Sequence, residues 1–157
     1  MTLEEQVLQK VAEWRLPSKQ RQTLTVPLED SGWTLHLTAD RCDEVGCLLW
    51  ETTLQRISPA ADVTLENWAR RITAQVHGLL EPLETIEIDS LRNEAQIRSN
   101  QPSKRGGELF YYEVQLKGNQ SATVRRFKAT GGKGRREQVA YALTHEVFAR
   151  LVQDLAY

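Results

Sequence analysis

Apolar residues recur every three or four positions in three segments of the chain, which is the spacing of one face of a helix. The first segment covers residues 3–14, and the second covers 64–79. The third follows the glycine-rich stretch at 131–134. Its apolar positions are Val139, Leu143, Val147, Leu151 and Leu155. We therefore predict three helices, one near each end of the chain and one in the middle.

Between the predicted helices, apolar and polar residues alternate with the period of two that is typical of strands. Three such runs, 23–28, 33–38 and 48–54, precede the middle helix, and four more are expected within 83–129. Pro27 has no amide donor, so the first run is predicted to form an edge strand. The residues expected on the inward face of the third run are Leu48, Trp50, Thr52 and Leu54.

The order α-βββ-α-ββββ-α predicts an α+β fold, in which an antiparallel sheet of about six or seven strands carries three helices mainly on one face. No repeat or long linker divides the chain, so we expect residues 1–157 to form a single domain. We expect ten side chains from these inward faces to be buried. They are Trp14, Leu37, Trp50, Trp68, Ile72, Ile86, Val114, Leu143, Val147 and Leu151.

The N-terminal residues and the length of the apolar stretches bear on where in the cell the protein is expected. Residues 1–6 have neither a basic nor an apolar region, so no signal peptide is predicted. The longest dense apolar stretch, residues 47–50, is far shorter than the ~20 residues of a membrane-spanning helix. We expect a cytoplasmic protein that does not contact a membrane.

The charge is divided unevenly along the chain, although the net charge is only −1. Residues 1–90 carry 8 basic and 15 acidic side chains, whereas residues 91–157 carry 12 basic and 6 acidic ones. Within 100–136, nine basic residues stand against Glu108 and Glu113. This asymmetry indicates a charged interaction, either between copies of the chain or with a partner.

The basic segment suggests an anion or nucleic-acid site, because cations contact phosphates and nearby aromatic rings stack on bases. A more specific hypothesis places an anion site in the glycine loop, where amides from Gly132 to Arg136 at the expected start of the third helix would hold the anion. The alternatives are a connector with solvated charges and a sheet face with cross-strand pairs to Glu113. The candidate residues are Lys104, Arg105, Arg125, Arg126, Lys128, Gly132, Lys133, Gly134, Arg135 and Arg136.

Cysteine and histidine residues give no complete metal or catalytic motif. Four residues separate Cys42 from Cys47, and adding the nearby His36 still leaves a zinc site one ligand short. We therefore expect one buried thiol and one loop thiol, with no metal and no cofactor. His145 and Glu146 begin a zincin-like H-E-x-x-H helix, but Ala149 stands where the second histidine is needed. These two residues are interpreted as ordinary helix positions.

The absence of a catalytic motif favours a non-catalytic protein-binding module or adaptor. The element order resembles that of class I type III secretion chaperones, which implies a chaperone-like dimer that binds extended protein segments. The chain differs from them in its extra strands within 83–129 and in its basic C-terminal half. The alternatives are an anion or nucleic-acid binder using residues 104–136, and an enzyme whose site is assembled from residues distant in sequence.

The charge asymmetry leads to a prediction about association. We expect a homodimer, because the acidic part of one copy attracts the basic part of another. Light scattering at low micromolar protein and moderate salt should give twice the 17.9 kDa mass of one chain. A single-chain mass at every concentration contradicts this prediction.

Overall fold

The computed structural model describes residues 1–16, 20–130 and 134–157 of the chain. Within these ranges there are three helices of eleven residues each, α1 (Leu3–Glu13), α2 (Leu65–Gln75) and α3 (His145–Leu155). Threonine side chains cap the N-terminus of all three, at Thr2, Thr64 and Thr144. None of the helices in the described ranges is long and apolar enough to cross a membrane.

The strands are more numerous than the alternation pattern predicts. The first three are β1 (Gln22–Leu28), β2 (Trp33–Cys42) and β3 (Gly46–Arg56), with a short 3-10 turn η1 (Glu29–Ser31) between the first two. The other seven are β4 (Leu83–Asp89), β5 (Glu94–Ser99), β6 (Ser103–Arg105), β7 (Glu108–Lys117), β8 (Ser121–Thr130), β9 (Arg136–Val139) and β10 (Tyr141–Thr144).

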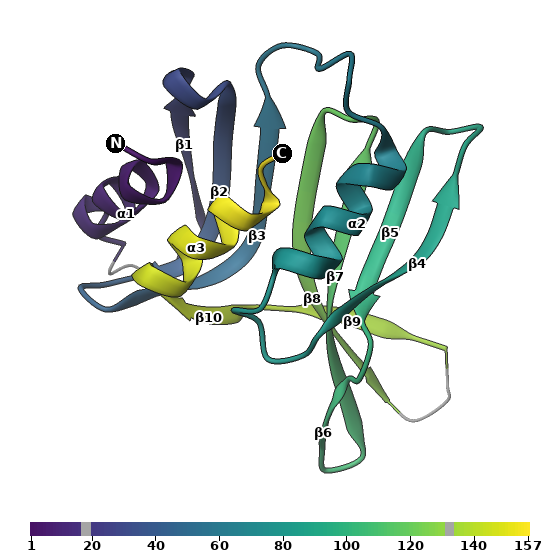
Figure 1. Cartoon of the computed structure of the whole chain (residues 1–157). Coiled ribbons are helices and arrows are strands. Elements are labelled where there is room, and N and C mark those ends of the chain that lie inside the picture. Colours follow the sequence, from purple (N-terminus) through teal and green to yellow (C-terminus); the bar gives the residue numbers. More distant parts are fainter. Residues whose placement is uncertain (17–19, 131–133) are drawn as a thin grey trace.

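All of these strands belong to one antiparallel sheet, whose main order is β1-β2-β3-β8-β7-β5-β4. The three helices lie against one face of this sheet (Figure 1). The predicted α+β class with an antiparallel sheet is therefore confirmed, and β1, which contains Pro27, is an edge strand as expected.

The two halves of the sheet join at β3 and β8, and this junction is forked. The two strands pair only through Thr52–Gln55 and Ser121–Val124. Beyond that point they separate, and each acquires a different partner, because β10 pairs with β3 and β9 pairs with β8. Ala140 alone joins β9 to β10. The chain therefore runs toward the junction along β8 and then away from it along β3.

The strands β9 and β10 correct the expected start of the third helix. The helix begins at His145, not directly after the glycine-rich stretch. Val139, Tyr141 and Leu143 are also spaced two apart, so the segment satisfies the strand period as well as the helical one. Pairing with two strand ends that would otherwise be unsatisfied favours the strand conformation.

The core lies between the helices and the sheet. Of the ten side chains expected to be buried, six are buried and three are partly buried. The buried ones are Leu37, Trp68, Ile72, Val114, Leu143 and Leu151, and the partly buried ones are Trp14, Trp50 and Val147. Trp68 connects the layers, since its ring nitrogen donates to the Leu155 carbonyl at 2.8 Å and its ring lies 5.8 Å from that of Trp33.

Two register irregularities explain the expected facings that are wrong. Ile86 is 48% exposed because the pairing of β4 with β5 shifts between Thr85 and Glu87. In β3 the register with β2 also shifts, so Cys47 and Leu49 face the core instead of Leu48 and Trp50. A bulge of this kind reverses the facing of every residue on one side of it.

The core predicts a clear contrast between two leucines. Leu151→Ala should lower the free energy of unfolding by about 2–5 kcal/mol, because it leaves a cavity under α3. Leu91→Ala, at a fully exposed position, should change it by less than about 0.5 kcal/mol. Urea unfolding of both variants measures this, and equal effects would show that α3 is not packed as described.

Candidate functional site

A cleft of about 480 Å³ opens at the fork of the sheet, and we call it the fork cleft. Its walls come from the β9–β10 junction, the first turn of α3 and the segment after α2. Its floor comes from β3, β7, β8 and β10, and Arg105 of β6 lies at its rim. The lining residues are Leu48, Gly78, Leu80, Arg105, Tyr112, Arg126, Ala140, Tyr141, Ala142, Leu143, Thr144 and Val147. The size and the mainly apolar lining are those of a binding pocket.

One edge of β10 faces this cleft without a strand partner among the described residues. The Asp43 amide donates to the Gly46 carbonyl, so Gly46 directs its backbone groups toward β2. The next residue, Cys47, therefore directs its own toward its partner Leu143. Because these directions alternate along a strand, the N–H and C=O of Ala142 point away from β3.

A buried ion pair closes the floor of the cleft. Arg126 and Glu81 are both only 4% exposed, and the guanidinium makes two hydrogen bonds to the carboxylate, of 3.0 and 3.2 Å. Ser99 and Ser103 also donate to this carboxylate, at 2.8 and 2.7 Å. The pair fixes the segment after α2 to the sheet, because Glu81 lies in that segment and Arg126 lies on β8.

The polar groups of the floor have shifted pKa values. Burial raises the pKa of Glu81, but the hydrogen bonds from Arg126, Ser103 and Ser99 outweigh it, so the net pKa lies below the ordinary value. Burial also raises the pKa of Tyr141, whose hydroxyl contacts the Thr52 hydroxyl at 2.9 Å. Glu81 is thus held as a carboxylate and Tyr141 as a neutral phenol.

The structure does not gather the predicted basic residues into one patch. Arg125 and Arg126 are neighbours on a strand, so their side chains lie on opposite faces of the sheet. Lys104 and Arg105 lie on β6 and are exposed, as are Gly134 and Arg135. Gly132 and Lys133 lie outside the described residues.

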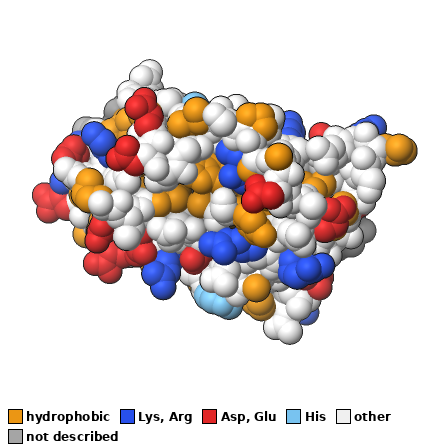
Figure 2. All heavy atoms as spheres, turned by 45° about the horizontal axis from the view of Figure 1, so that its top comes forward, with side chains coloured by type: hydrophobic (Ala, Val, Ile, Leu, Met, Phe, Trp, Pro, Cys, Tyr) orange, Lys and Arg blue, Asp and Glu red, His pale blue; other side chains and the backbone are white. Residues whose placement is uncertain are grey.

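Carboxylates pair with four of the seven basic candidate residues that the structure describes, Arg125, Arg126, Lys128 and Arg136. Arg125 pairs with Glu51 at 2.9 Å, and Lys128 pairs with Glu108 at 3.3 Å. Glu113 receives both Arg98 and Arg136, as the cross-strand alternative for this residue predicts. Acidic and basic side chains are also intermingled over the face drawn in Figure 2. These pairs reduce the charge available to a polyanion.

The expected anion site in the glycine loop does not lie at a helix N-terminus. It requires free amides at a helix N-terminus, but Arg136 begins a strand and the nearest helix starts nine residues later, at His145. The aromatic rings are engaged as well, because Tyr111 stacks on Phe127 and Arg136 covers Phe127 at 3.9 Å. Nucleic-acid binding by this segment stays a prediction.

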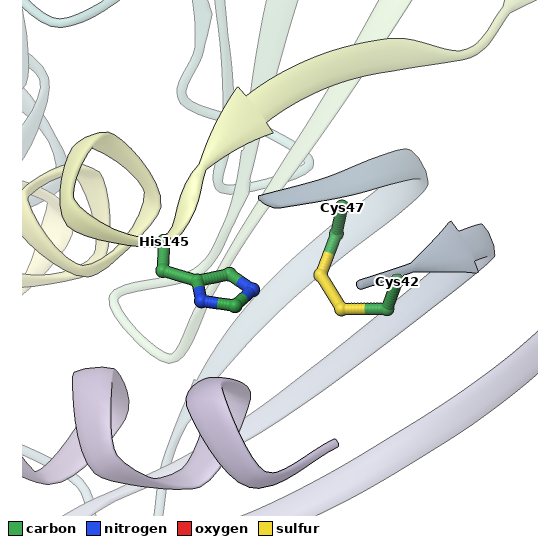
Figure 3. Close-up of side chains that lie close together, drawn as sticks. All are labelled: Cys42, Cys47 and His145. Atoms are coloured by element: carbon green, nitrogen blue, oxygen red, sulfur yellow. A yellow bond between two sulfur atoms is a disulfide. The ribbon is translucent and has the colours of Figure 1, made fainter. Parts of the chain in front are cut away.

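A second group of chemically reactive side chains lies at the tip of the β2–β3 hairpin (Figure 3). Cys42 and Cys47 face each other across the hairpin and form a disulfide, with both residues buried. The expectation of one loop thiol is therefore wrong. His145, at the start of α3, completes a cluster in which one ligating atom of each residue lies within 4.8 Å of the others. His36 is elsewhere, on β2, where its ring contacts Thr25 at 3.1 Å.

Backbone contacts hold this cluster together from three parts of the chain. Leu16 exchanges two hydrogen bonds with Cys42, of 2.9 and 3.1 Å. The His145 amide donates to the Val45 carbonyl at 3.0 Å, which ties the hairpin turn to α3. Gly46 lies so close to the Leu143 carbonyl that a side chain there would clash. Within the turn, amide hydrogen bonds from Val45 and Gly46 hold the pKa of Asp43 below its ordinary value.

The sequence contains no local signal that joins His145 to the cysteines. Ninety-seven residues separate His145 from Cys47, and the two meet only because Thr144 pairs with Gly46 in the β10–β3 register. Only the strand β10, which the helical pattern concealed, could have indicated this contact.

Comparisons with protein-family models, with curated proteins and with solved structures found no match. The resemblance to type III secretion chaperones consequently stays a prediction.

The buried pair generates a prediction about stability and pH. Arg126→Met should lower the free energy of unfolding at neutral pH by about 3–5 kcal/mol, because Glu81 remains buried without its cation. The difference from wild type should shrink as the pH falls. The wild type loses the stabilisation by Glu81 as the pH drops through its depressed pKa, whereas protonation relieves the variant.

The neighbouring Arg125→Met is the matched control. Its ion pair with Glu51 is partly exposed, so its removal should cost about 0–1 kcal/mol. Urea unfolding at neutral and mildly acidic pH measures both variants. A constant difference between Arg126→Met and wild type across this range would contradict the assigned role of Glu81.

Proposed function

We propose that this protein is a non-catalytic protein-binding module that binds an extended segment of a partner protein in the fork cleft. The observation that carries the proposal is the unpaired edge of β10, which lies along a mainly apolar cleft. An added strand supplies backbone hydrogen bonds along such an edge, and side-chain pockets supply the specificity.

The unpaired edge of β10 is short, and its length limits how much of the binding free energy backbone hydrogen bonds can supply. Only the backbone groups of Ala142 and the amide of Thr144 point outward, because the Thr144 carbonyl faces the first turn of α3. Each backbone hydrogen bond contributes about 0.5–1.5 kcal/mol net, so the bonds alone give weak binding. Contacts with the apolar walls, including the 68% exposed Leu80, must supply the rest.

The charges at the cleft indicate the chemistry of the partner. Glu81 neutralises Arg126, whereas Arg105 lies exposed at the rim, above the ring of Phe110 at 5.1 Å. Among the described carboxylates none forms an ion pair with Arg105. The segment that fits best is therefore extended and apolar, with an acidic residue near one end. Binding of extended segments also agrees with the chaperone-like element order.

A displayed library of random short peptides tests this function. The wild-type protein should select peptides with apolar residues and an acidic residue, and Ala142→Pro should weaken the binding of the selected peptides at least about tenfold, or about 1.4 kcal/mol. Proline removes the outward amide of Ala142 but leaves the bonds to β3, since only Leu143 and Tyr141 use that side.

Leucine replacements give the matched comparison. Leu80→Ala should weaken the binding of the selected peptides. Leu91→Ala makes the same substitution at an exposed turn away from the cleft and should leave this binding unchanged. Selection of no peptide, or equal binding by all variants, contradicts the proposal. The wild-type protein could also prove to be a homodimer that both Leu80→Ala and Ala142→Pro dissociate. In that case a second copy of the chain, and not a partner protein, occupies the cleft.

A further inference from the structure

His145 carries a buried polar atom that has no partner in the structure. Its side chain is only 7% exposed, and Nε2 is one of two buried side-chain polar atoms without a hydrogen bond among the described residues. Leaving a buried polar group unsatisfied costs about 1–3 kcal/mol. Such an atom therefore indicates a ligand that this position serves.

The imidazole is directed at the two sulfur atoms. In Figure 3 the far edge of the His145 ring, which carries one of its nitrogens, faces the disulfide from the start of α3. The three ligating atoms lie within 4.8 Å of one another, and all three residues are buried. Two thiolates and one imidazole are the ligand set of open, three-residue zinc sites, in which the fourth position stays free.

We propose that reduction of the Cys42–Cys47 disulfide converts this cluster into a binding site for a soft divalent metal ion, with Zn²⁺ as the best fit. Cys42 and Cys47 would bind through Sγ and His145 through Nε2. The inference does not depend on the peptide-binding function, because it rests on different residues and different chemistry.

The chemistry balances in two steps. A dithiol reductant transfers two electrons and two protons, so the S–S bond breaks, two thiols form and the reductant becomes a disulfide. The metal ion then replaces the two thiol protons, which are released to solvent, and Nε2 donates its lone pair while the ring proton resides on Nδ1. A disulfide oxidant then takes two electrons from the metal-bound thiolates and two protons from solvent to become a dithiol, while the Cys42–Cys47 bond re-forms and the metal ion is expelled, so occupancy follows the redox state.

The fold allows this exchange without rearrangement of the backbone. Zn–S bonds of about 2.3 Å in tetrahedral geometry place two sulfurs about 3.8 Å apart. Rotation of the cysteine side chains can reach this separation, since their Cα atoms lie 4.1 Å apart on paired strands. Clefts of about 410 and 420 Å³ border Cys47 and Cys42 respectively, and both include the exposed Val45. They give an ion and a fourth ligand access to the site.

Cobalt titration under anaerobic conditions tests the site. Protein reduced with a phosphine should bind one Co²⁺ per chain, with thiolate-to-cobalt charge-transfer absorption and tetrahedral visible bands, and Zn²⁺ should displace it. Oxidised protein should bind no Co²⁺. Cys47→Ser should abolish the charge-transfer absorption. His145→Ala should lower the affinity for Co²⁺ at least about tenfold, because one of three ligands is lost.

His36→Ala is the matched control, because His36 is near Cys42 in sequence but lies apart from the cluster, and it should bind Co²⁺ like wild type. No charge-transfer absorption in the reduced wild type overturns the proposal, as does unchanged affinity in His145→Ala. If His145→Ala fails to fold, the ¹⁵N shift of His145 Nε2 in the wild type decides. It should move on addition of Zn²⁺ to reduced protein, and an unmoved shift overturns the role of His145.

Discussion

The separation of β3 from β8 is the constraint on which the rest of the structure depends. The two strands join the halves of the sheet over four residues each and then diverge, which exposes backbone donors and acceptors on both arms. The strands β9 and β10 satisfy those groups and fill the fork (Figure 1). Since each of them pairs with only one arm, β10 keeps an edge without a strand partner among the described residues, and the fork cleft forms beside it.

The same junction places the second candidate site. Because β10 ends where α3 begins, the register of Thr144 with Gly46 brings His145 to the cysteine pair. The fork cleft, which runs along β10 as far as Thr144, therefore reaches the residue next to His145 of the cysteine–histidine cluster.

The charge pattern acquires a different meaning in three dimensions. Along the sequence it divides into an acidic part and a basic part, which suggests one charged partner. In the fold, β3 from the acidic part lies beside β8 from the basic part, and Glu51 consequently meets Arg125. Glu81 from the acidic part and Arg126 from the basic part form a buried pair on the β8 side of this junction. Much of the charge asymmetry is thus neutralised by ion pairs within the chain.

The sequence by itself determined the α+β class, the three helical segments, the edge position of β1 and most of the core. These follow from local periodicity and from single residues such as Pro27, whose effects do not depend on distant partners. Only the tertiary structure decided β9 and β10, because a spacing that fits both periods is resolved by the strand ends available to it. It also decided the facing of Trp50 and Ile86, since bulges depend on the neighbouring strand. The meeting of His145 with Cys42 and Cys47 is likewise tertiary, because long-range register carries no local sequence signal.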